Sequence, residues 1–163
     1  MCMDKPSIRS AGLLVLCIAI PLLAGVIGSF VTMSAIPTWY AQLEKPSFTP
    51  PNWVFGPVWT VLYILMGVSL YLIVQNGLER RAVQQGVIIF SAQLALNTLW
   101  SIAFFGMQSP LYGLITILAL LALISATIVS FWRISKTATA FLVPYACWVC
   151  LATALNAMIL VLN

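Results

Sequence analysis

The sequence contains no histidine and only three acidic residues among 163. Charged residues make up 6% of the chain, whereas a soluble domain carries about 25%. So few charges would not cover a water-exposed surface, and hydrophobic residues account for 63% of the sequence. The composition therefore predicts an integral membrane protein consisting of a single domain, residues 1–163.

The same absences exclude several kinds of chemistry. Without histidine the chain has no Ser-His-Asp triad, and most metal sites are also removed. Proton-coupled and ion-coupled carriers place ionisable groups at membrane depth, but no acidic residue lies inside a long apolar segment. We therefore predict no metal site, no obligatory cofactor and no ion-coupled transport. The basic residues form no cluster beyond the flanks of the apolar segments, so we predict no nucleic-acid partner.

Two cysteines, Cys147 and Cys150, are spaced as C-W-V-C. In a soluble protein this spacing is typical of a redox or zinc motif. Here the pair lies in an apolar segment without a second pair or a basic neighbour. We therefore interpret both cysteines as small apolar residues of a buried helix.

Five charge-free apolar segments follow one another along the chain. They cover residues 11–32, 53–74, 83–105, 111–132 and 140–162. Each exceeds the roughly 20 residues that a helix needs to cross a bilayer. The stretch GMQSPLYG supplies a turn between the third and fourth segments. The sequence thus predicts an all-α membrane protein, a bundle of five transmembrane helices with a long first loop over residues 33–52.

The positions of Lys and Arg predict the orientation of this bundle. Six of the seven basic residues lie in the N-terminal flank and in the second and fourth loops, which share one side of the membrane. The opposite side has only Lys45, in the first loop. Because cytoplasmic loops carry the excess of Lys and Arg, we predict the N-terminus inside and the C-terminus outside.

Polar and aromatic residues in three of the segments recur at helical spacing, each set on one face. The sets are Trp59, Tyr63, Met66 and Leu70; Gln93, Asn97, Trp100 and Ser101; and Tyr145, Trp148, Ala152 and Asn156. An unpaired amide in hydrocarbon is costly, so each amide should face another helix or a cavity. Two interpretations stay open: interhelical hydrogen bonds that hold the bundle, or polar groups that line a ligand pocket.

The predicted orientation favours the pocket. It places Trp59, Asn97, Trp100 and Asn156 in the outer half of the membrane, with the small Ala152 near mid-depth. Above them, the stretch WYAQLEKPSFTPPNWVFGPVW holds six aromatic residues and four prolines. Long loops in compact bundles are usually functional. We therefore expect this stretch to form the lid and upper wall of a pocket for a flat apolar ligand.

Three stretches resemble the signature of the TspO/MBR family, which contains the tryptophan-rich sensory proteins and translocator proteins. They are W-Y-x-x-L-x-K-P-S-F-T-P-P-x-W-x-F-G-P-V-W-T-x-L-Y-x-x-M-G from residue 39, Q-L-x-L-N-x-x-W-S-x-x-F-F from residue 93 and P-Y-x-x-W-x-x-x-A-T-x-L-N from residue 144. The resemblance covers nearly the whole chain. It implies five tilted helices around a pocket closed by the first loop.

The resemblance also implies ligands and site residues. The ligands would be tetrapyrroles such as protoporphyrin IX and haem, benzodiazepine-type drugs and, in animal members, cholesterol. The motif positions give the ligand-binding residues Tyr40, Trp53, Phe55, Trp59, Asn97, Trp100, Trp148, Ala152, Leu155 and Asn156. The final helix lacks the Tyr and Arg of the cholesterol motif proposed for animal members, which lowers the expectation of sterol binding. The compact N-terminus without a transit peptide suggests a member in a prokaryotic cell membrane.

Three functional classes fit the resemblance. The first is a receptor or sensor that binds tetrapyrroles, and the second is a carrier that moves them passively, since no coupling group lies in the spans. The third is an enzyme that degrades protoporphyrin IX in light, with Trp59 and Trp148 flanking the macrocycle, where they are oxidised or supply electrons.

The resemblance further implies a homodimer in the membrane, and lipid as a partner. Small residues let helices approach closely. Ser91 and Ala95 on the third segment, or Ala24 and Gly28 on the first, would offer such a surface, and the resemblance favours the third segment.

Overall fold

The computed structural model describes residues 8–163, and these residues form helices without any strand. Five stretches of them are long and apolar enough to cross a membrane, which confirms the predicted fold class. The α-helices are α1 (Ile8–Ala35), α2 (Asn52–Val74), α3 (Arg81–Ser101), α4 (Pro110–Trp132), α5 (Lys136–Ala140) and α6 (Val143–Leu162). Two π-helical turns, η1 (Ile36–Tyr40) and η2 (Ile102–Gly106), extend α1 and α3.

The first helix is longer than the sequence indicated, because helical structure continues through η1 to Gln42 instead of ending at residue 32. Polar residues lie at this end of the helix, and their hydroxyls bond back to its backbone. Ser34 donates to the Val31 carbonyl at 2.9 Å, and Thr38 donates to the Ser34 carbonyl at 2.9 Å. Hydroxyls satisfied in this way are compatible with a helix. The first loop is therefore about half as long as predicted, running over residues 43–51.

The last span consists of two helices. The short α5 begins at Lys136, where the Ser135 hydroxyl accepts a hydrogen bond from the Ala138 amide at 3.2 Å. A break at Phe141 and Leu142 precedes α6, and Pro144 lies in the first turn of that helix. Proline has no N–H to donate to the preceding turn, so a break before it is expected.

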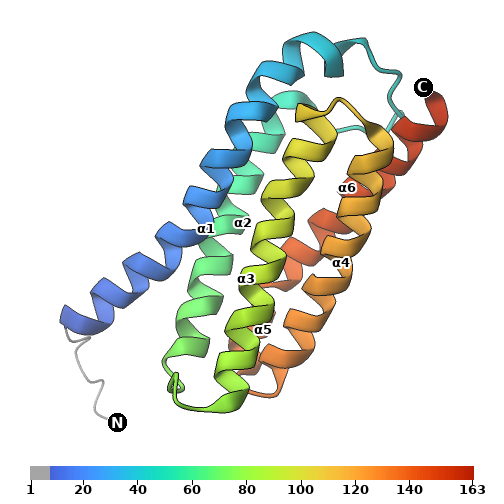
Figure 1. The fold of residues 1–163 in the computed structure, drawn as a ribbon. Helices are drawn as coiled ribbons and strands as arrows, with labels where there is room; N and C mark the ends of the chain where they lie inside the picture. The colour runs from blue at the N-terminus through green and yellow to red at the C-terminus, as the bar shows by residue number, and fades with distance from the viewer. Residues whose placement is uncertain (1–7) are drawn as a thin grey trace.

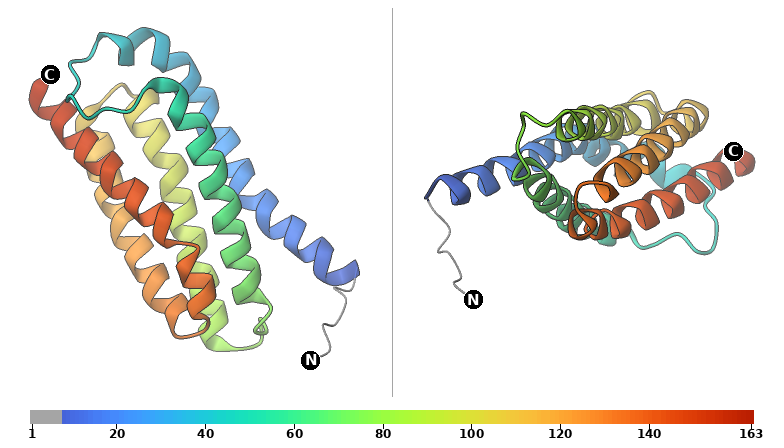
Figure 2. Two further views of the ribbon diagram at one scale, coloured as in Figure 1. Left: turned by 180° about the vertical axis from the view of Figure 1, so that it is seen from behind. Right: turned by 90° about the horizontal axis from the view of Figure 1, so that it is seen from below.

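The helices form a closed bundle in which α1 contacts α2 and α3, α4 contacts α3 and α6, and α5 contacts α2 (Figures 1 and 2). The N-terminal part of α1 leans away from the other helices, while its C-terminal part crosses the top of the bundle in Figure 1. The start of α1 and the end of α6 lie at opposite ends of the bundle, as five spans require.

Glycines let α1 and α2 approach closely in the lower half of the bundle. A side chain on Gly67 would collide with the backbone of Cys17 and Ile18, and its Cβ would lie 2.8 Å from the Cys17 carbonyl oxygen. Gly25 on α1 lies in the same way against the ring of Tyr63. Close helix approach at small residues is a common way to hold membrane helices together.

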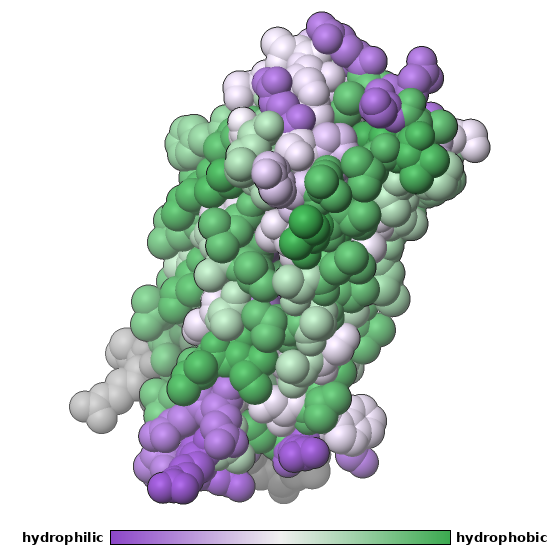
Figure 3. Space-filling model, turned by 45° about the vertical axis from the view of Figure 1, so that its right-hand side comes forward, coloured by the Kyte–Doolittle hydropathy of each residue, from purple (hydrophilic) through white to green (hydrophobic). Residues whose placement is uncertain are grey.

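The surface has an apolar belt between two polar ends (Figure 3). Large apolar side chains that are at least half exposed include Val15, Ile88, Leu99, Ile115 and Val129. Such side chains are stable only against lipid, because in a bilayer the surrounding solvent is itself apolar. The surface therefore agrees with the five spans and makes the chain an integral, multi-pass membrane protein.

Candidate functional site

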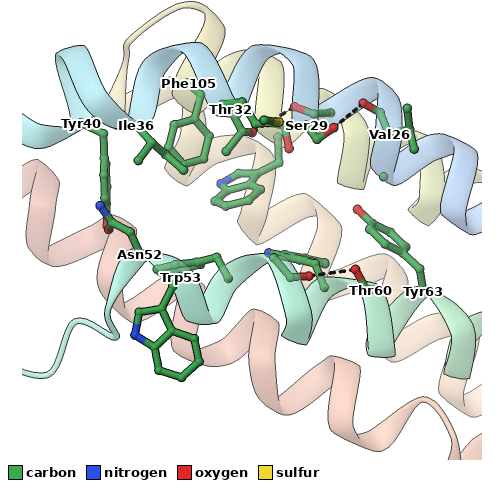
Figure 4. A pocket seen from close by; sticks show the side chains of 18 of the residues that line it. Val26, Ser29, Thr32, Ile36, Tyr40, Asn52, Trp53, Thr60, Tyr63 and Phe105 are labelled. Carbon is green, nitrogen blue, oxygen red and sulfur yellow. Dashed lines mark hydrogen bonds between the residues drawn. The ribbon is translucent and has the colours of Figure 1, made fainter.

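A cavity of about 490 Å³ lies between α1 and α2, near the end of the bundle that carries the first loop (Figure 4). Its wall is largely apolar and contains no charged residue. The lining residues are Leu22, Gly25, Val26, Gly28, Ser29, Thr32 and Met33 of α1, Ile36 and Tyr40 of η1, Asn52, Trp53, Phe55, Gly56, Trp59, Thr60 and Tyr63 of α2, and Trp100, Ser101 and Phe105. Volume and lining are those of a site for a small apolar ligand.

The contribution of α1 was missed by the sequence analysis, which predicted no ligand-binding residue on this helix. The signal was present as a stripe of small residues. Gly25, Gly28, Ser29 and Thr32 follow the spacing i, i+3, i+4 and i+7, which is one helical face. In the structure this face borders the cavity. A face without bulky side chains leaves space beside a helix that carries many aromatics.

Trp59 is the centre of the aromatic wall. Its indole stacks on the ring of Tyr63, with 5.5 Å between the ring centroids and 28° between the planes. The rings of Trp100 and Tyr145 both lie 6.3 Å from Trp59. Ring pairs at these separations attract each other beyond the area they bury. The wall is therefore held in place before any ligand is present.

The two π-helical turns bring further aromatic rings to the loop end of the cavity. Tyr40 of η1 lies 5.7 Å from Phe105 of η2, and Phe105 contacts Phe104 at 4.8 Å. On the loop side, the Lys45 ammonium lies 4.8 Å from the centre of the Tyr40 ring. Burial raises the pKa of the Tyr40 phenol above its ordinary value, so this group is neutral at physiological pH.

A second, much smaller cavity of about 30 Å³ lies beside the first. Tyr40, Phe55, Trp100 and Phe105 border both cavities. Three of the predicted ligand-binding residues, Ala152, Leu155 and Asn156 of α6, border only the smaller one. The predicted site is thus divided: Tyr40, Trp53, Phe55, Trp59 and Trp100 line the large cavity, whereas Ala152, Leu155 and Asn156 line only the small one.

The predicted site residue Asn97 lines neither cavity but holds three helices together. Its side-chain oxygen accepts a hydrogen bond from the Tyr63 hydroxyl at 2.6 Å, and its amide nitrogen donates to the Tyr145 hydroxyl at 3.2 Å. The Tyr145 hydroxyl in turn donates to the Gln93 side-chain oxygen at 2.9 Å. For Asn97, the structure therefore favours the interpretation as an interhelical hydrogen bond.

The other two predicted polar or aromatic residues of α6 also have packing partners. Asn156 accepts from the Trp100 indole nitrogen at 3.3 Å and donates to the Pro110 carbonyl at 2.7 Å. Trp148 lines neither cavity, and its ring packs edge-on against Phe55 with centroids 5.9 Å apart. Its indole N–H is buried without a hydrogen-bond partner. The cysteines of the C-W-V-C motif, Cys147 and Cys150, are exposed on the surface of the helix instead of buried.

The first loop was expected to close the pocket, but residues 43–51 contribute no lining to either cavity. The loop is tied to the end of α6. The Glu44 amide donates to the Asn163 side-chain oxygen at 3.0 Å, and the Asn163 side-chain nitrogen donates to the Glu44 carbonyl at 3.1 Å. The aromatic stretch thus supplies the cavity wall from Tyr40 and from α2, while the loop lies across the end of the bundle.

The structure predicts that Ala152 tolerates little added volume. Leucine adds three carbons where a void of about 30 Å³ is available, so we expect Ala152→Leu to lower the free energy of unfolding by about 1–3 kcal/mol. Thermal unfolding in detergent measures this loss. The control is Ala154→Leu on the exposed side of the same helix, which should leave the melting temperature unchanged. Weaker ligand binding by Ala152→Leu at unchanged stability would instead place Ala152 in the ligand site.

The fold and the cavity define an integral membrane protein with a charge-free, aromatic, ligand-sized site inside a five-helix bundle. The family model described as "TspO/MBR family" matches residues 17–162. The chain is 47% identical to the tryptophan-rich protein TspO of Chlorobaculum tepidum over 92% of this chain and 95% of the relative. It is 49% identical to the protein of the same name of Archaeoglobus fulgidus, over 85% and 89%. The chain belongs to the TspO/MBR family.

The relatives extend to animals. The translocator protein of Homo sapiens is 39% identical over 72% of this chain and 70% of its own length. The family contains proteins named translocator protein and tryptophan-rich sensory protein, which makes this chain a member of a membrane receptor and sensor family.

Proposed function

We propose that the protein is a membrane receptor for tetrapyrroles and similar flat apolar ligands, with the cavity between α1 and α2 as its site. The observation that carries this proposal is the set of aromatic rings along one wall, with Trp59, Tyr63 and Trp100 packed side by side. Flat aromatic walls suit planar ligands, because stacking gains contact area without ordering flexible side chains. The small residues of α1 on the opposite wall leave room for the thickness of such a ligand.

The proposed site has a polar end that suits the carboxylates of a porphyrin. Asn52 and Tyr40 line the cavity near the loop, and Lys45 lies behind the Tyr40 ring. In the part of the chain that the structure describes, the other cations lie at the start of α1 or near the turns at the same, opposite end of the bundle. A ligand with an apolar body and acidic groups at one edge would therefore point these groups toward Lys45.

The photo-oxidative alternative has weaker support. It requires Trp59 and Trp148 on opposite sides of the macrocycle, but Trp148 lies outside the lining and packs against Phe55. We therefore propose binding without a chemical step. A passive carrier would need a second opening of the cavity at the far end of the bundle, where glycine contacts bring α1 and α2 together.

We also propose that the protein is a homodimer through α3 in a prokaryotic cell membrane. Ser91 and Ala95 are both exposed on α3, where small side chains would let a second helix approach closely. The alternative surface on α1 is used inside the chain, because Gly28 is buried against Ser101 and the Ala24 carbonyl accepts from the Thr98 hydroxyl at 3.3 Å.

Titration of the purified protein with protoporphyrin IX tests the proposed function. We expect saturable quenching of tryptophan fluorescence with a dissociation constant in the micromolar range or below, about −8 kcal/mol or tighter. The dimethyl ester of the same porphyrin should bind several-fold more weakly, because its edge carries no charge for Lys45. A linear, non-saturating decrease in fluorescence with both compounds would mean that the cavity does not accept tetrapyrroles.

A further inference from the structure

The cavity lies in the opening of a V formed by α1 and α2. The helices touch where Gly67 meets Cys17 and Ile18, and again where Gly25 meets Tyr63. On the loop side of these contacts, the cavity lies between the two helices (Figure 4). A space between two diverging helices has two ways out: past the loop at the end of the bundle, or sideways between the helices into the surrounding bilayer.

The sides of the V are not covered by other parts of the chain. On α1, Val26 is 50% exposed and Met33 is 72% exposed, although both line the cavity. On α2, Gly56 and Thr60 line the cavity and are exposed as well. These residues belong to the candidate membrane spans, so their exposed surface faces lipid. Gly56 borders open space, because an added Cβ would find no atom within 4 Å.

The loop at this end of the bundle lines neither cavity and is held in place by named contacts. The Asn163 side chain makes two hydrogen bonds with the backbone of Glu44. Inside the loop, the Thr49 amide and hydroxyl both donate to the Pro46 carbonyl, at 3.1 and 2.7 Å. Lys45 donates to the Leu43 carbonyl at 2.9 Å. Opening this route would break several hydrogen bonds together, whereas the side route breaks none.

We propose that the gap between α1 and α2, bordered by Val26, Met33, Gly56 and Thr60, is a lateral portal through which an apolar ligand passes between the cavity and the bilayer leaflet on the loop side. By the predicted orientation this is the outer leaflet. The inference rests on the proposed function for the nature of the ligand. The portal also fits the polarity of the cavity. An amphiphile in that leaflet has its polar edge at the membrane–water interface, and Asn52 and Lys45 lie at the same end of the bundle.

The kinetics of protoporphyrin IX exchange between lipid vesicles and the reconstituted protein test the portal. Gly56→Phe adds a ring at a position where a Cβ meets no atom within 4 Å, and Gly12→Phe on α1 is its matched control, since a Cβ there also meets none. We expect Gly56→Phe to slow both association and dissociation by at least tenfold, and because Gly56 also lines the cavity, the two exchange rates and not the affinity are the readout. Gly12→Phe should stay within twofold of wild type. Weaker affinity of Gly56→Phe with unchanged or faster dissociation would overturn the portal.

A second variant tests the other route. Asn163→Ala removes the two hydrogen bonds to Glu44 and should leave both exchange rates within twofold of wild type. Several-fold faster exchange in Asn163→Ala, together with wild-type rates in Gly56→Phe, would show that ligands pass under the loop.

A third measurement needs no porphyrin and so separates failure of the portal from failure of the proposed function. Phospholipids brominated on the acyl chain should quench Trp59, measured as the difference between wild type and Trp59→Phe. Gly56→Phe should at least halve this quenching, and equal quenching in both backgrounds would contradict an opening to lipid.

Discussion

Trp59→Ala is expected to weaken protoporphyrin IX binding by at least 30-fold, which corresponds to about 2 kcal/mol, the threshold of a binding hot spot. Trp59 lines the large cavity, and its indole contacts Tyr63, Trp100 and Tyr145. Removing it takes away the flat surface for the ligand and leaves the neighbouring rings without a shared partner. The measurement is the titration described above, performed on purified variants of equal helicity.

The control for this substitution is Trp132→Ala. Trp132 ends α4 at the far end of the bundle, is 56% exposed and lines neither cavity. The Trp132→Ala variant should bind porphyrin as tightly as the wild-type protein does. Trp59→Phe keeps an aromatic ring and should lie between wild type and Trp59→Ala. If Trp59→Ala and Trp132→Ala lost affinity equally, binding would reflect loose association with surface aromatics and not the cavity.

Gly67→Ala is expected to destabilise the bundle by about 2–3 kcal/mol, the upper part of the range for overpacked interiors. One methyl group on α2 would meet the backbone of α1 at Cys17 and Ile18, and backbone atoms have no alternative rotamer. The two helices would have to separate along the contact that anchors the V. We expect a lower melting temperature in detergent and, because the cavity depends on the divergence of these helices, weaker ligand binding as well.

Gly12→Ala is the matched control, because an added Cβ there meets nothing within 4 Å. Alanine has the higher helix propensity, so this variant should be at least as stable as wild type. Equal melting temperatures for Gly67→Ala and Gly12→Ala would show that the distance between α1 and α2 at Gly67 is large enough to accept a methyl group, contrary to the structure.

The spans could be predicted because the bilayer imposes its length and polarity on each segment separately. For α2 and α4 the predicted ends agree with the structure to within one residue, since charged residues or turn residues follow directly. The end of α1 was placed too early, because Ser34 and Thr38 satisfy their own hydroxyls inside the helix. Local composition does not distinguish a hydroxyl that bonds backward from one that begins a loop.

The aromatic wall was also visible in the sequence. Trp59 and Trp100 were predicted to converge at one end of the bundle, and their rings lie 6.3 Å apart. Their helices run through the membrane in opposite directions, so the depth of each residue followed from its distance to the ends of its span. Depth in a membrane is a one-dimensional quantity, and a sequence with clear spans determines it.

The sequence alone thus determined the membrane location, the number of spans and the depth of the aromatic and amide side chains, because each follows from local polarity and chain length. Only the tertiary structure decided which neighbour each face meets. In the structure, Asn97 forms hydrogen bonds with Tyr63 and Tyr145, and Ala152 lies beside a small void. The small-residue face of α1 forms the second wall of the cavity. The reason is rotational: a helix with apolar residues on all sides carries little signal for which side turns inward, so contacts between helices fix that choice.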